Sequence, residues 1–153
     1  MAEVVLTDEL ARAGLLGAVT VESAGTGDWH VGAGMHGAAR DELTRRGYDG
    51  SGHRARQFQA SWLARYDLVL ALDRSNLAAL QDMAPDPQTA GRISMLRSFD
   101  PALRPDDAYH GEVPDPYGGG PGDYALAFDL VLAAVRGLTA RLAGLLGAAT
   151  PRA

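Results

Sequence analysis

Apolar residues recur along the chain at two spacings, one typical of amphipathic helices and one typical of buried strands. The helical spacing predicts four helices, and the alternating or near-continuous apolar runs predict three strands. The predicted helices cover residues 2–13, 35–46, 76–83 and 123–146. The predicted strands are 19–23 (VTVES), 67–72 (DLVLAL) and 92–97 (RISMLR). Helices that alternate with strands favour an α/β fold with a parallel sheet.

The order of these elements differs from the usual one, because the first predicted element is a helix. Open parallel sheets usually place a buried strand before their first helix, with the ligand loop between the two. No such strand precedes the helix at 2–13 in this sequence. Asp73 or Ser75 can cap the helix at 76–83. A polar loop rich in Pro, Asp and Gly covers about residues 99–121.

The composition is that of a soluble globular protein. The 153 residues are 46% hydrophobic and 22% charged, and we expect one domain at 1–149 with a tail at 150–153. The net charge of −5 provides no basic surface for nucleic acid or anionic lipid. All 14 basic residues counted as Lys or Arg are arginine, so chemistry that needs a lysine is excluded. No cysteine is present, which excludes disulfides and thiol nucleophiles within these residues.

Two segments bear on the location of the protein. The first ten residues carry Glu3, Asp8 and Glu9, which is unlike the basic start of a signal peptide. The apolar region near 130–149 is interrupted by two arginines, and we expect it not to span a bilayer. The predicted location is cytoplasmic.

Two further patterns do not meet the requirements of a cofactor or metal site, so we expect no cofactor. The stretch GAGMHG (32–37) matches G-x-G-x-x-G, but the preceding strand ends about eight residues earlier, and Gln57 stands where a dinucleotide site needs an acid. We interpret these glycines as loop residues. The four histidines show no metal-binding spacing, so we expect no metal.

Several polar or aromatic residues allow both a structural and a functional interpretation. Asp115 in EVPDPYGGG suits a turn, yet an aspartate held between two prolines also suits a general acid. Ser23 is an ordinary strand-end residue or a hydroxyl facing a ligand loop. Trp29 either packs locally or lines a cleft for a flat ring. His53 belongs to a solvated charged segment, or it hydrogen-bonds to a loop.

Taken together, six stretches resemble the low-molecular-weight protein tyrosine phosphatases. They are MAEVVL, VESAGTGDWHVG, GHRARQF, DLVLALDRSNL, MLRSFDP and VPDPYGG, and they occur in the family's order over almost the whole chain. The resemblance implies a three-layer α/β fold with a four-stranded parallel sheet, here without the family's first strand and phosphate loop. It implies a hydrolase that forms a phosphocysteine intermediate and acts on a phosphotyrosine protein or a small aryl phosphate.

The resemblance also implies roles for individual residues. Asp115 falls on the general acid that protonates the leaving oxygen. Tyr117 and Trp29 fall on aromatic residues of the substrate cleft, and Gly118 replaces a frequent second tyrosine. Ser23 and His53 fall on residues that support the phosphate loop. Asp73 falls on a position of the family that follows the strand.

One departure concerns the nucleophile. The family's cysteine lies in a loop of the form C-x-x-x-x-x-R-S-P, which is typically followed by M-A-E, and this chain starts at Met1-Ala2-Glu3. We therefore expect the natural phosphatase to extend upstream, and the polypeptide as printed to be inactive. The alternatives are a non-catalytic remnant or binding module and a relative of the arsenate reductases, whose chemistry needs further cysteines.

Overall fold

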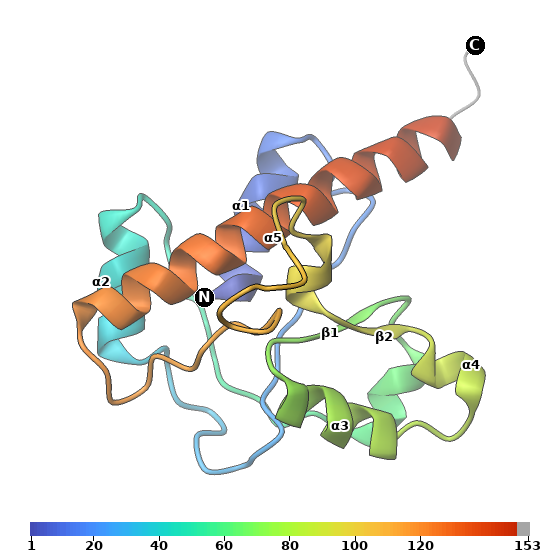
Figure 1. Cartoon of the computed structure of the whole chain (residues 1–153), viewed down its shortest axis with the longest axis horizontal. Coiled ribbons are helices and arrows are strands. Elements are labelled where there is room, and N and C mark those ends of the chain that lie inside the picture. Colours follow the sequence, from blue (N-terminus) through green and yellow to red (C-terminus); the bar gives the residue numbers. More distant parts are fainter. Residues whose placement is uncertain (150–153) are drawn as a thin grey trace.

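The structure, a computed structural model, describes residues 1–149 and has an α/β architecture around a small parallel sheet (Figure 1). The sheet has two strands, β1 (Val69–Ala71) and β2 (Ile93–Met95). Their residues pair in the order Val69 with Ile93, Leu70 with Ser94, and Ala71 with Met95. These strands confirm the predicted strands at 67–72 and 92–97, although each is shorter than its apolar run.

The four predicted helices are present, with ends that shift by up to three residues. Short elements that the periodicity did not predict lie between them: the four-residue helix α4 and two 3₁₀ helices, η1 and η2. The bounds are α1 Ala2–Arg12, α2 Gly37–Arg45, η1 Ala60–Ala64, α3 Arg74–Asp82, α4 Pro87–Ala90, η2 Leu96–Phe99 and α5 Pro121–Ala149. The predicted tail at 150–153 lies outside the described residues.

The prediction of a strand at 19–23 is wrong. Residues 19–24 are irregular, and the nearest sheet-like contact is an isolated parallel bridge between Gly25 and Gln57. A strand needs a neighbour that satisfies its backbone groups. Within residues 1–149, no strand lies beside this segment to provide the ladder, so the apolar alternation alone does not produce a strand.

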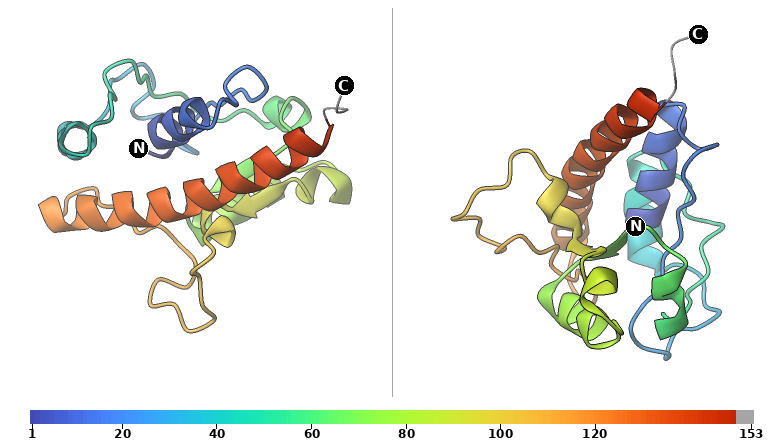
Figure 2. Two further views of the ribbon diagram at one scale, coloured as in Figure 1. Left: turned by 90° about the horizontal axis from the view of Figure 1, so that it is seen from above. Right: turned by 90° about the vertical axis from the view of Figure 1, so that its right-hand side faces the viewer.

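The two faces of β1 pack on different hydrophobic clusters, as the predicted parallel strand covered on both sides requires. Val69 and Ala71 join the cluster that also holds Leu63, Leu80 and Ile93. Leu70 and Leu72 pack against the main core, which α1, α2 and α5 share. The sheet therefore separates a layer formed by η1 and α3 from a layer formed by α1, α2 and α5 (Figure 2).

Helix α5 supplies much of the main core. Its inward residues Ala127, Phe128, Val131, Ala134 and Val135 are buried. By length and hydropathy alone, Pro121–Gly147 could also cross a membrane, so the sequence argument that this region is too interrupted to span one does not hold. A helix that forms the core of a soluble protein passes the same test, and α5 packs against α1, α2 and η2.

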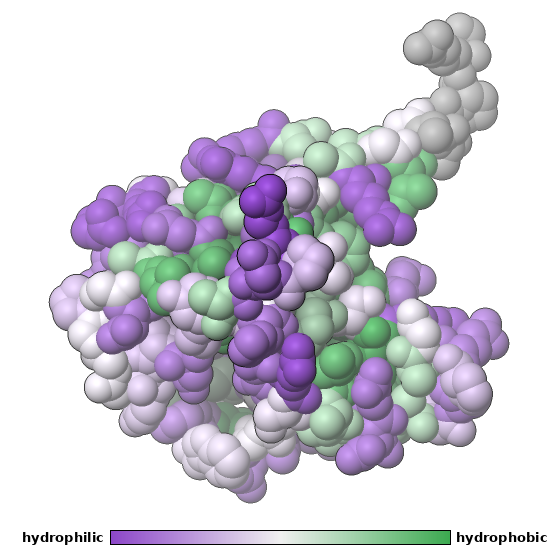
Figure 3. Space-filling view, viewed as in Figure 1, coloured by the Kyte–Doolittle hydropathy of each residue, from purple (hydrophilic) through white to green (hydrophobic). Residues whose placement is uncertain are grey.

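The segment between η2 and α5 projects from the body of the molecule (Figure 2). Its base is held by Arg97, which is 3% exposed and lies in η2. The guanidinium contacts Asp107 at 2.8 Å and Asp100 at 3.4 Å, and it donates a hydrogen bond to the Glu112 carbonyl oxygen at 3.3 Å. The projecting part forms a hydrophilic ridge on the face shown in Figure 3.

Candidate active site

The loop that carries Asp115 is attached to the carboxyl end of β1. The Val113 amide donates a hydrogen bond of 2.8 Å to the Leu72 carbonyl oxygen. Asp115 Oδ1 then accepts a hydrogen bond from the Tyr117 amide at 3.0 Å, which forms a local turn. Ligand sites in open α/β sheets lie beyond the carboxyl ends of the strands. Asp115 is therefore placed at the edge of the sheet where such a site is expected.

Both aromatic residues that were predicted to contact substrate are exposed. Tyr117 is 66% exposed, and its ring centroid lies 5.2 Å from that of His36 and 6.3 Å from that of His30. Trp29 is 79% exposed. Exposed aromatic rings on a polar surface are available to stack on a flat ligand.

The loop that carries Trp29 is fixed at both ends. The Gly25 amide donates to the Arg56 carbonyl at 2.9 Å, and the Gly32 amide donates to the Ala55 carbonyl at 2.8 Å. The indole of Trp29 folds back over Gly27, where a Cβ atom would overlap the ring. The absence of a side chain at position 27 therefore allows this orientation of Trp29.

Ser23 and His53 meet at one carboxylate. Ser23 Oγ donates to Glu3 Oε2 at 2.6 Å, and His53 Nδ1 lies 3.0 Å from the same oxygen. Burial alone would raise the pKa of Glu3, but hydrogen bonds from Ser23 and His53 outweigh it and leave the pKa lowered. Arg56 also donates to the Ser23 carbonyl at 3.1 Å. The cluster lies at the first turn of α1, where a carboxylate is favoured by the helix dipole.

Asp73 has a structural role in this conformation. Its side chain caps α3 by accepting a hydrogen bond of 2.6 Å from the Asn76 amide, as the sequence predicted for Asp73 or Ser75. It directly follows Leu72, the residue that anchors the Asp115 loop. The cap and the loop are thus supported at the same end of β1.

Three residues of the site were not assigned a role from the sequence. Glu3 was considered only as part of an acidic N-terminal segment, while His36 and Tyr124 lie 88 positions apart and meet through a contact of 3.0 Å between Tyr124 Oη and His36 Nδ1. No spacing rule connects residues so distant in the chain. Tyr124 is buried in the first turn of α5, but the sequence does not indicate its partner.

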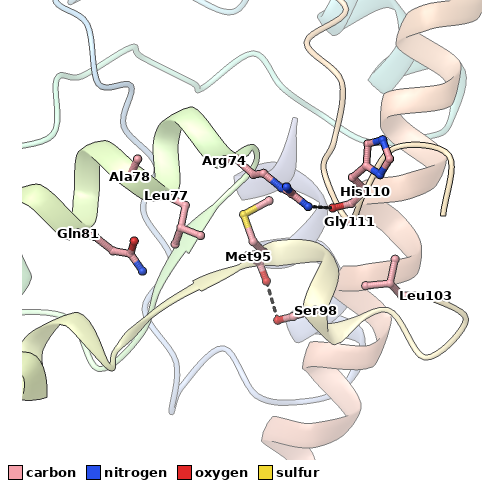
Figure 4. A pocket seen from close by; sticks show the side chains of 9 residues that line it. All are labelled: Arg74, Leu77, Ala78, Gln81, Met95, Ser98, Leu103, His110 and Gly111. Carbon is pink, nitrogen blue, oxygen red and sulfur yellow. Dashed lines mark hydrogen bonds between the residues drawn. The ribbon is translucent and has the colours of Figure 1, made fainter. Parts of the chain in front are cut away.

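Two shallow pockets lie on the surface of the described residues. One, of about 380 Å³, is formed by α3, η2 and the projecting loop, with Arg74 reaching toward His110 (Figure 4). The other, of about 370 Å³, includes Glu3 and His53 beside α1. Neither includes Asp115, Trp29 or Tyr117. Within residues 1–149, no three histidine, aspartate or glutamate side chains gather as ligands of a metal ion.

Known proteins with similar sequences belong to one family. The family model described as "Low molecular weight phosphotyrosine protein phosphatase" matches residues 1–145. The chain is 44% identical to a low molecular weight protein-tyrosine-phosphatase of Streptomyces coelicolor, over 92% of this chain and 83% of the relative. It is 39% identical to low molecular weight protein-tyrosine phosphatase A of Mycobacterium tuberculosis, over 90% and 80%.

Solved structures show the same fold. A protein tyrosine phosphatase from Entamoeba histolytica, crystallised with Hepes in its active site, superposes with a TM-score of 0.86 at 26% identity, covering 95% of this chain and 88% of that one. YfkJ from Bacillus subtilis superposes with a TM-score of 0.81 at 30% identity, covering 97% and 87%. The fold is the α/β fold of these phosphatases. The chain belongs to the low molecular weight phosphotyrosine protein phosphatase family.

Proposed function

We propose that this chain provides the general acid and the substrate walls of a protein tyrosine phosphatase site. The observation that carries the proposal is the attachment of the Asp115 loop to the carboxyl end of β1 by the Val113–Leu72 hydrogen bond. Membership of the phosphatase family supports the same reaction. Its substrate is a phosphotyrosine protein or a small aryl phosphate.

In this proposal Asp115 protonates the oxygen of the leaving phenol. The phenol of tyrosine has a pKa near 10, so its phenoxide is a poor leaving group and benefits from a proton in the transition state. Trp29 and Tyr117 pack against the aromatic ring of the substrate. Ser23 and His53, joined through Glu3, support the loop that binds the phosphoryl group.

The reaction needs a nucleophile that these 153 residues do not contain. The family's chemistry runs through a cysteine thiolate, and the 153 residues contain no cysteine. We propose that the 153-residue polypeptide does not hydrolyse phenyl phosphate unless a cysteine loop is joined to it. Its alternative role is that of a non-catalytic binding module.

The test compares two proteins that differ in one segment. The 153-residue chain is expected to show no turnover, whereas the same chain preceded by an apolar strand and a Cys-x5-Arg-Ser-Pro loop is expected to hydrolyse phenyl phosphate. In the extended form, Asp115→Asn is expected to lower kcat by about 10²- to 10⁴-fold. The loss is expected to be smaller with 4-nitrophenyl phosphate, whose leaving group needs less protonation.

The leaving-group dependence separates an acid from a structural aspartate. If Asp115→Asn lowers both rates equally, the residue maintains the loop and is not the acid. If the extended chain folds but does not turn over, the alternative role as a binding module is favoured. The cytoplasmic location remains a prediction.

A further inference from the structure

We infer that His36 is a positioning residue that holds the Tyr117 ring in the substrate cleft, with Tyr124 as its own support. The inference rests on the proposed function, because the position of Tyr117 matters only if this site takes an aryl phosphate. It gives a role to a histidine whose sequence spacing did not indicate a metal site. It also connects the acid loop to two helices, α2 and α5.

The contacts of His36 run in two directions. Its ring centroid is 5.2 Å from that of Tyr117, with the ring planes at 59°. It also stacks on Tyr124 at 5.9 Å and 13°, and its Nδ1 lies 3.0 Å from Tyr124 Oη. Tyr124 is 3% exposed in the first turn of α5, so it is a fixed support. His36 itself is the residue that precedes α2.

The acid loop needs such a support because little else fixes its tyrosine. Tyr117 is followed by three glycines, and Gly118 has a φ of +80°, a region that favours glycine. The hydrogen bonds of this loop, such as that from the Tyr117 amide to Asp115, hold the backbone but not the ring. With 66% of Tyr117 exposed, burial does not hold the ring either. The ring contacts to His36 and, at a longer distance, to His30 remain.

The buried phenol of Tyr124 gives His36 a defined orientation. A buried hydroxyl needs a hydrogen-bond partner, and the Tyr124 hydroxyl lies 3.0 Å from Nδ1 of His36. Removing only the Tyr124 hydroxyl therefore frees the histidine ring to rotate and weakens its contact with Tyr117.

The first experiment uses the 153-residue chain and needs no catalysis. Nitrogen-15 NMR of His36 is compared in Tyr124→Phe and the control Tyr48→Phe, and proton shifts of the Tyr117 ring are compared in these two variants and in His36→Phe. Tyr48 is also buried, and its hydroxyl bonds to Glu9 at 3.0 Å, so its loss is a matched change elsewhere. Tyr124→Phe is expected to change the His36 nitrogen shifts and to move the Tyr117 signals toward those of an unstructured tyrosine.

In the same experiment His36→Phe, which keeps a ring without the nitrogen, is expected to preserve part of the Tyr117 shift. The control Tyr48→Phe is expected to leave both sets of signals unchanged. Tyr117 signals that do not respond to Tyr124→Phe or His36→Phe would overturn the inference. These outcomes are independent of whether the protein is a phosphatase.

The second experiment measures the consequence in the form that carries the cysteine loop. His36→Ala is expected to raise KM for phenyl phosphate about 3- to 10-fold with little change in kcat. The KM of an alkyl phosphate, which has no ring to stack, is expected to be unchanged. Equal increases in KM for both substrates would show that His36 has only a structural role, and this result would overturn the inference. No turnover in any variant would instead contradict the proposed function.

Discussion

The two ends of the segment between η2 and the start of α5 are held in opposite ways. At its base, the buried guanidinium of Arg97 joins Asp100 and Asp107 and the backbone of residue 112. At its far end, Asp115 and Tyr117 are held by short-range turns and by exposed rings. Figure 2 shows this segment projecting from the body of the molecule.

The buried base contributes to the stability of the fold, whereas the exposed end is available for ligand recognition. A buried ion pair is tolerated because each charge has a partner, and removing one partner strongly destabilises the folded protein. Exposed rings contribute little to folding but remain available to a ligand. We therefore expect substitutions at the base to affect unfolding, and substitutions at the exposed end to affect binding with little change in stability.

The largest effect is expected from Arg97→Met. The substitution keeps an aliphatic side chain of similar length but leaves the buried carboxylate of Asp100 without its partner. We expect a loss of about 3–5 kcal/mol in the free energy of unfolding, measured by urea denaturation. Arg74→Met is the matched control, because Arg74 is 70% exposed and pairs with Glu112 at 3.3 Å. An exposed pair contributes about 0–1 kcal/mol, and equal losses in the two variants would remove the distinction.

The next largest effect on stability is expected at the contact between η2 and α5. A Cβ atom at Gly137 would overlap the carbonyl oxygen of Phe99, which is backbone and cannot rotate away. Gly137→Ala is therefore expected to destabilise the protein by about 1–3 kcal/mol. Gly144→Ala on the same helix has open space around its Cβ. It is expected to stabilise the protein by about 0.5–1 kcal/mol, and a loss there of the same size would contradict the steric argument.

Much of this fold could be predicted from the sequence, because local patterns determine its main elements. The run at 67–72 and the stripe of α5 each require burial, and the structure buries Val69 and Phe128 as expected. The segment 19–23 is the exception. Its alternation is typical of a strand, but a strand forms only beside a partner, and a pattern within one segment does not reveal the partner.

The candidate site was predictable where a short motif carries it. The loop around Asp115 and the aromatic residue at 29 stand in contiguous stretches that resemble the family. The convergence of Ser23 and His53 on Glu3 joins segments 20 and 50 positions apart, and the pairing of His36 with Tyr124 joins segments still farther apart. Such contacts depend on tertiary packing and are not encoded in any local spacing.

A smaller effect on stability, but a clear one on the aromatic surface, is expected from Gly27→Ala. The new methyl group would overlap the Trp29 indole, which is exposed and free to turn away. We expect a change in the free energy of unfolding of less than about 0.5 kcal/mol. We also expect a shift in Trp29 fluorescence, measured with Trp62→Phe so that only one indole reports. Gly34→Ala has open space at its Cβ and is the control; a large loss of stability in Gly27→Ala would show that the Trp29 ring is held in place and is not free to turn away.

The smallest effect is a pH dependence that arises at the base of the loop. Hydrogen bonds from the Arg97 side chain and the Gly111 amide lower the pKa of Asp107 in the folded protein. A carboxyl group with a lowered folded-state pKa stabilises the protein above its unfolded pKa, and this contribution is lost as the pH falls through the folded value. Stability is therefore expected to decrease between about pH 5 and pH 2. Asp107→Asn is expected to reduce that decrease, whereas Asp106→Asn, at an exposed neighbouring position, is expected to preserve it. If both variants keep the full pH dependence, other carboxylates determine the acid sensitivity, and the base of the loop is held by Asp100 and the backbone more than by Asp107.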